Sequence, residues 1–131
     1  MSRILGRYAD AIYALLRFVA GFMFMFHGLQ KILGLVGGQK VPVGTLIWFG
    51  GMIELIGGIL IMIGLLASWA AFLASGMMAV AYFMVHQPQG TWPVQNQGEL
   101  AALYAFVFLY IAARGSGPFS VARASRNPAL D

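Results

Sequence analysis

The sequence predicts an all-α integral membrane protein, a four-helix transmembrane bundle that forms a single domain over residues 1–131. Hydrophobic residues make up 60% of the chain and charged residues only 9%, whereas a soluble domain carries about 25% charged residues. The mean hydropathy is +0.81. Polar and glycine-rich segments divide the apolar sequence into stretches near the length of about 20 residues that one membrane crossing needs.

The first expected span covers residues 11–33. Residues 34–42 contain three glycines and one proline and are expected to form a loop. The apolar run that follows is too long for one crossing. It is therefore divided into spans at residues 43–64 and 68–86, joined by a tight turn at residues 64–68.

The fourth expected span, residues 97–114, follows a polar loop at residues 86–98 that contains two prolines. Four spans place both ends of the chain on the same side of the membrane. That side would carry five arginines, namely Arg3, Arg7, Arg114, Arg123 and Arg126. The positive-inside rule then predicts a multi-pass protein of the cell (inner) membrane with both termini in the cytoplasm.

Glu54 lies at the centre of the second expected span. An ionised carboxylate at this depth costs at least about 2.5–3.5 kcal/mol unless it is paired, protonated or solvated. Glycines occur three and four residues before and after it, so they share its helix face and predict close helix packing. These glycines are Gly50, Gly51, Gly57 and Gly58. Both a structural ion pair and a direct chemical role are open for Glu54.

Polar residues are expected on one inward face of each of the other spans. The first span carries Arg17, Ala20, Phe24, His27 and Lys31 at helical spacing, within an arc of about 80°. The third carries Ser75, Ala79, Tyr82 and His86, and the fourth carries Glu99, Leu103, Phe106 and Tyr110. The depth of each charged residue within its span allows two ion pairs, Arg17 with Glu54 and Lys31 with Glu99, and these pairs are expected.

Four of these residues are candidates for binding a ligand near the outer face: His27, Lys31, His86 and Glu99. Each has a simpler interpretation: packing for His27, snorkelling for Lys31, a loop-edge position for His86 and a helix cap for Glu99. The absence of cysteine excludes disulfide exchange and thiolate-bound metal clusters. No metal site is expected, the histidine spacing does not require haem, and the scattered basic residues do not indicate nucleic-acid binding.

Several of these residues also form a motif series. Arg17 is followed by His27-Gly28-x-x-Lys31, then by Glu54-x-x-Gly57-Gly58 with Gly64, then by Asn96-Gln97-Gly98-Glu99. In this order the series resembles the DoxX family of small four-helix membrane proteins. The glycine-rich stretch at residues 115–120 resembles the family's ending, although Val121-Ala122 replaces its usual Leu-Asp.

The resemblance implies a quinone-linked redox or oxidative-stress component. Some relatives resemble subunits of a thiosulfate:quinone oxidoreductase or a terminal quinol oxidase, and others resemble membrane partners of superoxide dismutase and a sulfurtransferase. The expected partners are membrane lipids, a quinone and oxidoreductase subunits. Two alternatives are a non-enzymatic scaffold, with homo-oligomers as one form, and a small-molecule binder or transporter that uses Arg17 and Lys31.

Overall fold

The computed structural model describes residues 3–131, so the first two residues of the expected domain lie outside it. Within the described range the chain consists of helices joined by turns and loops, and it contains no β-strand. The all-α class predicted from the sequence is therefore confirmed.

The chain forms long helical rods separated by short connections. The first is α1 (Ala9–Leu33), which follows the short 3-10 turn η1 (Gly6–Tyr8). The second runs through α2 (Leu46–Met52), η2 (Ile53–Gly57) and α3 (Gly58–Ile63), and the third through α4 (Ala67–Ala81), η3 (Tyr82–His86) and η4 (Gln87–Gln89). The short α5 (Pro93–Asn96), the long α6 (Glu99–Arg114), the short α7 (Val121–Ser125) and the turn η5 (Pro128–Leu130) complete the chain.

Glycines end two of these helices. Gly34 follows α1 with φ of 67°, and Gly64 follows α3 with φ of 69°; this left-handed conformation is the usual helix ending. A Cβ on Gly64 would also collide with Ser120 and lie 3.0 Å from Cζ of Arg17. The turn expected at residues 64–68 is therefore present between Ile63 and Ala67, and it lies against the C-terminal segment.

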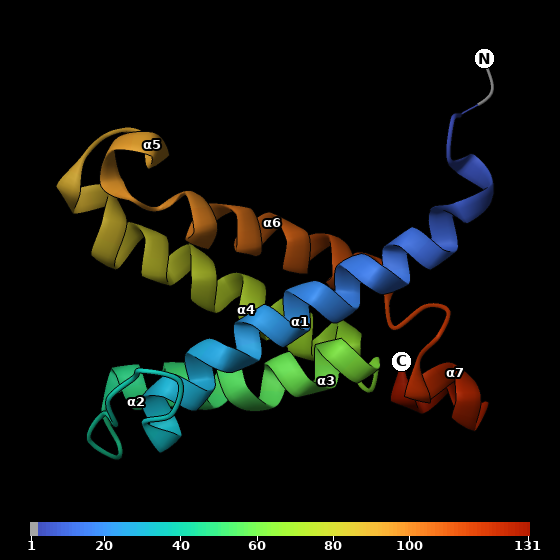
Figure 1. Ribbon diagram of the computed structural model, residues 1–131, viewed down its shortest axis with the longest axis horizontal. Coiled ribbons are helices and arrows are strands. Elements are labelled where there is room, and N and C mark those ends of the chain that lie inside the picture. The colour runs from blue at the N-terminus through green and yellow to red at the C-terminus, as the bar shows by residue number, and fades with distance from the viewer. Residues whose placement is uncertain (1–2) are drawn as a thin grey trace.

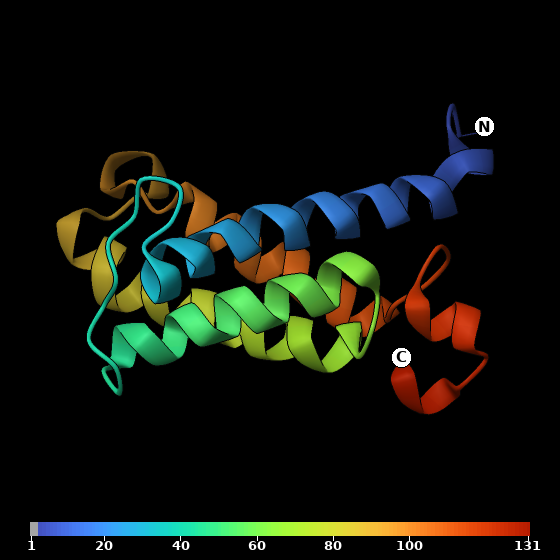
Figure 2. The same cartoon turned by 60° about the horizontal axis from the view of Figure 1, so that its bottom comes forward.

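The rods pack as two pairs that cross each other. Helix α4 runs beside α6, and α1 packs against η2 and α3 (Figures 1 and 2). The hydroxyl of Ser75 donates to the Ala105 carbonyl at 2.7 Å and so joins the first pair. Between the pairs lies a core of aromatic, aliphatic and small side chains that includes Phe24, Phe108 and Ile61.

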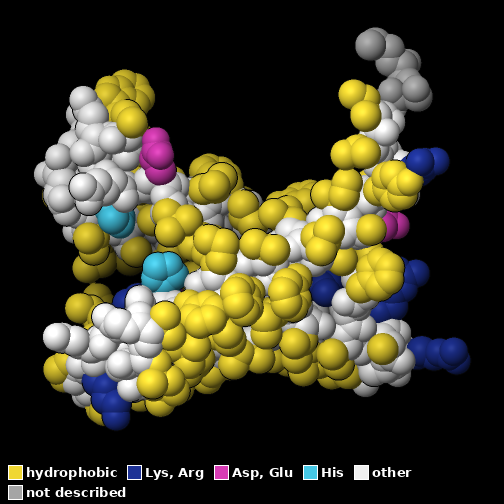
Figure 3. Space-filling view, viewed as in Figure 1, with side chains coloured by type: hydrophobic (Ala, Val, Ile, Leu, Met, Phe, Trp, Pro, Cys, Tyr) yellow, Lys and Arg dark blue, Asp and Glu magenta, His cyan; other side chains and the backbone are white. Residues whose placement is uncertain are grey.

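Three helical segments of the described chain are long and apolar enough to cross a membrane: Gly6–Leu33, Leu46–Ile63 and Ala67–Gln89. Helix α6 has 16 residues, or about 24 Å at 1.5 Å per residue, which is shorter than the hydrocarbon core of about 30 Å. Apolar side chains cover most of the visible outer surface (Figure 3). This surface fits a lipid environment, in which exposed apolar side chains carry no penalty.

Glycines of α1 allow it to approach the second rod closely. A Cβ on Gly21 would lie 2.6 Å from the Gly58 carbonyl oxygen, and one on Gly28 would collide with the backbone of Leu55. Of the four glycines expected to pack, Gly58 and Gly51 meet α1 closely. Gly50 and Gly57 have only ordinary van der Waals neighbours, so close packing does not extend to the whole set.

Gly58→Ala is expected to lower the free energy of unfolding by about 1–3 kcal/mol, the usual cost of forcing extra atoms into a filled contact. Its new Cβ would lie 2.6 Å from the backbone nitrogen of Met25. The matched control is Gly57→Ala, whose Cβ would find its first neighbour at 3.9 Å. Thermal unfolding in detergent measures both variants, and equal melting temperatures would contradict the assigned contact.

Candidate functional site

A polar cavity of ≈ 300 Å³ lies where α1, η2, the end of the third rod and the start of α6 meet. Four ionisable side chains line it: His27, Lys31, Glu54 and His86. Its other lining residues are Phe24, Met78, Ala81, Gln97, Leu100, Ala101 and Tyr104. Both histidines are visible at the same hollowed end of the molecule (Figure 3). The fold thus gathers polar groups from four distant parts of the sequence.

Lys31 and Glu54 form an ion pair in the wall of this cavity. The ammonium Nζ of Lys31 lies 2.6 Å from both carboxylate oxygens of Glu54. The Glu54 side chain is only 5% exposed, whereas that of Lys31 is 33% exposed. This pair corrects the two expected pairings, because Lys31 takes the place assigned to Arg17 and leaves Glu99 without its expected partner.

Two π-helical turns position the acidic and basic groups. Glu54 lies in η2, and His86 is the last residue of η3. A π turn inserts one extra residue into a helix and so rotates the following side chains relative to an α-helix, and such turns are frequent at functional sites. Simple 3.6-residue periodicity could not predict either turn, although Glu54 is buried and His86 lines the cavity as expected from the sequence.

His86 is held by the loop that precedes α6. Its Nδ1 lies 3.2 Å from the Asn96 carbonyl oxygen. Since a carbonyl can only accept, Nδ1 carries a proton, and Nε2 of the neutral ring is left as an acceptor. Asn96 is itself fixed, because its side-chain amide donates to the Tyr82 hydroxyl at 3.2 Å and its side-chain oxygen accepts from Gly98 N at 2.8 Å.

The hydroxyl of Tyr104 is the unsatisfied group of the site. Tyr104 is 6% exposed, and its hydroxyl has no hydrogen-bond partner within residues 3–131. Its ring stacks on Phe108 with centroids 5.1 Å apart and meets Phe24 edge-on at 5.5 Å. A buried polar group without a partner costs about 1–3 kcal/mol, and Tyr104 brings such a group to the wall of the cavity.

The structure brings together three of the four candidate ligand residues. His27, Lys31 and His86 line the cavity, whereas Glu99 is exposed and lies outside its lining. The polar stripe expected on the fourth span faces outward, since Leu103, Phe106 and Tyr110 are all exposed.

The inward stripe of α6 consists instead of Ala101, Tyr104, Phe108 and Ile111. Two further lining residues, Tyr104 and Gln97, were not among the candidates named from the sequence. The apolar spacing of this buried stripe was the available signal for Tyr104. Gln97 has a left-handed backbone, with φ of 59°, and no spacing rule would have found it.

Arg17 is buried, with 2% of its surface exposed, but it does not contact Glu54 as expected. Its guanidinium donates instead to backbone carbonyls: Nε to Ile61 at 3.1 Å, Nη2 to Phe119 at 2.8 Å, and Nη1 to Ser116 and Pro118. Arg17 thus fastens the C-terminal segment to α1 and α3, and its charge is solvated by peptide dipoles. It lies outside the polar cavity.

The arrangement can donate hydrogen bonds and exchange protons. Within residues 3–131, no group of three or more His, Asp or Glu side chains is placed to hold a metal ion. The two histidines, the Lys31–Glu54 pair and Tyr104 line a cavity of ≈ 300 Å³. This chemistry suits an uncharged molecule with hydrogen-bond-accepting oxygens.

Comparison with known proteins supports a family assignment. A model of the DoxX family matches residues 12–87, a range that contains His27, Lys31, Glu54 and His86. An uncharacterized protein of Haemophilus influenzae is 38% identical over 120 residues, which cover 86% of this chain and 90% of that protein. No solved structure matches. The chain belongs to the DoxX family and is a membrane protein.

Lys31→Met is expected to destabilise the protein by about 3–5 kcal/mol, since removing one partner of a buried pair leaves an uncompensated charge. Glu54→Gln should cost less, because the longer and more exposed Lys31 can turn toward water. Replacing both residues by Met should recover part of the loss. Thermal unfolding in detergent tests this series, with the exposed Lys40→Met as the control, and a double variant no better than Lys31→Met would argue against the pair.

Arg17→Lys is expected to release the C-terminal segment, because an ammonium cannot reproduce the planar set of hydrogen bonds made by a guanidinium. Charged hydrogen bonds contribute about 1.5–3 kcal/mol each. Cleavage by trypsin after Arg123 and Arg126 should therefore become at least about tenfold faster. Mass spectrometry measures the rate. Arg7→Lys, at an exposed position, is the control, and unchanged cleavage would show that Arg17 does not hold the segment.

Proposed function

We propose that this protein is a quinone-binding membrane subunit of an oxidoreductase complex, and that the polar cavity is its quinone site. The hydroxyl of Tyr104 carries the proposal. Among the described residues 3–131 it is a buried donor without a partner, and Tyr104 lines the same cavity as Lys31. The carbonyl oxygens of a quinone only accept hydrogen bonds, so the Tyr104 hydroxyl and the Lys31 ammonium would serve as their donors.

The size of the cavity also supports a quinone ring. A volume of ≈ 300 Å³ is at the lower end of the range of about 300–1,000 Å³ for small-molecule sites. Phe24 and Met78 supply apolar wall for the faces of the ring. Leu100 lines the cavity and is partly exposed, so an isoprenoid tail could leave toward lipid at that point.

The histidines suit the proton chemistry of a quinone. Reduction to the quinol takes up two electrons and two protons. An imidazole can both donate and accept a proton, and the hydrogen bond to Asn96 leaves Nε2 of His86 able to accept one. The chain has no cysteine to hold an iron–sulfur cluster. The electron donor is therefore assigned to a partner subunit. The same complex would then account for the oxidative-stress role that the family resemblance implies.

The proposal includes the membrane arrangement predicted from the sequence. Helix α6 would be the fourth crossing, tilted or in a locally thinned bilayer. Both ends of the described chain lie at the same end of the molecule (Figure 1), as an even number of crossings requires. Arginines near these ends favour the cytoplasmic side of the inner membrane, which places the polar cavity near the outer face.

One observation weakens the alternative that this protein transports a small anion. That alternative used Arg17 and Lys31 as attracting charges, but carbonyl oxygens surround Arg17 and the Glu54 carboxylate neutralises Lys31. A scaffold role, alone or as a homo-oligomer, would not require an unpaired hydrogen-bond donor at Tyr104.

Tyr104→Phe is expected to weaken binding of a short-chain quinone about fivefold, the contribution of one hydrogen bond. The matched control is Tyr110→Phe on the same helix, where the hydroxyl already pairs with Arg114 outside the cavity. Binding to protein in lipid nanodiscs is measured by displacement of a labelled quinone. Absence of quinone binding by the unaltered protein, or equal loss in both variants, would refute the proposal and favour a scaffold.

A further inference from the structure

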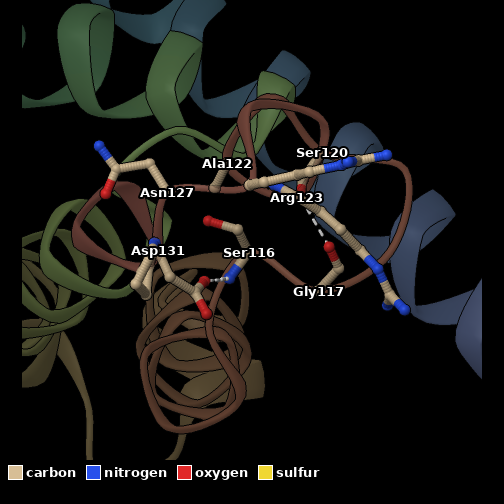
Figure 4. Close-up of a pocket in the computed structure, with 9 residues that line it drawn as sticks. Ser116, Gly117, Ser120, Ala122, Arg123, Asn127 and Asp131 are labelled. Carbon is tan, nitrogen blue, oxygen red and sulfur yellow. Dashed lines mark hydrogen bonds between the residues drawn. The ribbon is translucent and has the colours of Figure 1, made fainter.

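A second pocket, of ≈ 330 Å³, lies in the segment that follows α6 (Figure 4). Its polar lining residues are Ser116, Ser120, Arg123, Arg126, Asn127 and Asp131. The polar cavity includes the beginning of α6, whereas this pocket lies beyond its end. The length of α6, about 24 Å, therefore separates the two sites, and the second site does not depend on the proposed quinone function.

The hydroxyl of Ser116 indicates that this pocket is built to hold a polar group. Ser116 is 1% exposed, yet its hydroxyl has no hydrogen-bond partner in the described part of the chain. Figure 4 shows it directed into the space between Ala122, Asn127 and Asp131. The backbone on both sides is fixed, since the Ser116 N–H donates to the Asp131 carboxylate and its carbonyl accepts from Arg17.

The pocket offers charges of both signs. Arg123, Arg126 and Asp131 are all exposed and contribute to its lining, and the Asp131 carboxylate lies next to Ser116. Ser116, Ser120 and Asn127 add neutral polar side chains to the lining. A simple anion would meet the carboxylate, and a simple cation would meet the arginines. The complementary ligand carries an anionic and a cationic group close together.

The surroundings of the pocket favour a lipid as the source of that ligand. Phe119, which is 79% exposed, and Val121 project from the same segment as Arg123. Exposed apolar side chains beside arginines suit a segment lying at the membrane interface, where the apolar groups enter the acyl region and the cations remain at headgroup level.

We propose that this pocket binds the headgroup of a zwitterionic phospholipid of the phosphoethanolamine type. Arg123 and Arg126 bind the phosphate, and Asp131 with the Ser116 hydroxyl accepts hydrogen bonds from the ammonium. A choline headgroup cannot donate these bonds, and a glycerol headgroup lacks the positive charge. The pocket therefore selects the ethanolamine headgroup over both.

The test is native mass spectrometry of the full chain with phosphatidylethanolamine, phosphatidylcholine or phosphatidylglycerol. The unaltered protein is expected to retain the ethanolamine lipid at least about fivefold better than either of the others, as one or more hydrogen bonds require. Asp131→Asn keeps an oxygen for the Ser116 N–H but should abolish the preference over phosphatidylcholine. Ser116→Ala should reduce the preference about fivefold.

Charge controls separate this site from general attraction to lipid. Arg123→Gln with Arg126→Gln should lower occupancy by all three lipids at least about tenfold, the contribution of charged hydrogen bonds. Arg3→Gln with Arg7→Gln removes the same charge outside the pocket and should leave the selectivity unchanged. Equal retention of the three lipids, or equal effects of the two charge pairs, would overturn the proposal.

A soluble ligand is excluded in the same experiment. Free phosphoethanolamine should displace the lipid only weakly, because the contacts of Phe119 and Val121 with the acyl region are lost. Displacement by soluble phosphoethanolamine at concentrations comparable to those of the lipid would show that the pocket serves a soluble metabolite, and the lipid proposal would then be wrong. Thermal melting of each variant confirms that the compared proteins are folded.

Discussion

The structure depends on one constraint, namely that every charged group within the apolar body must find a partner there. Glu54 and Arg17 both lie in the predicted first two spans and are nearly inaccessible. The protein satisfies them in different ways. Glu54 takes a lysine from the last turn of α1, and Arg17 takes carbonyl oxygens from a non-helical segment. These two solutions act at different levels of α1, at a cavity end near Lys31 and at an anchoring end near Arg17.

At the cavity end, closely packed helices hold the polar side chains in place, while one buried hydroxyl lacks a hydrogen-bond partner among the described residues. Glycine contacts bring α1 against the second rod, and this close approach places Lys31 beside Glu54. Asn96 fixes His86 from the other side. Within this frame the Tyr104 hydroxyl finds no hydrogen-bond partner among the described residues. A donor that is already held in one orientation is preorganised, because binding to it requires little further ordering of side chains.

The sequence was sufficient to predict helix class, the turn near Gly64 and the inward face of α1, because hydropathy and glycine chemistry act locally. Common depth grouped His27, Lys31, His86 and Glu99, and the structure brings the first three to one cavity but not Glu99. It was wrong about the ion pairs, since depth alone does not distinguish Arg17 from Lys31 as the partner of Glu54. The π turns at η2 and η3 and the left-handed Gln97 depend on tertiary packing, so helical periodicity could not reveal them. The face of α6 that carries Glu99 and Tyr110 was predicted to point inward but is exposed. The face that points into the core carries Ala101, Tyr104, Phe108 and Ile111.

The anchoring end has a consequence for how such proteins diverge. Arg17 binds the main chain at Ser116, Pro118 and Phe119, and every amino acid carries a carbonyl oxygen. Side chains in this segment can therefore drift without loss of the anchor, while the insertion or deletion of a single residue would misplace all three acceptors together. Homologues with little resemblance in this segment can retain the same closure, provided that they keep its length and the arginine.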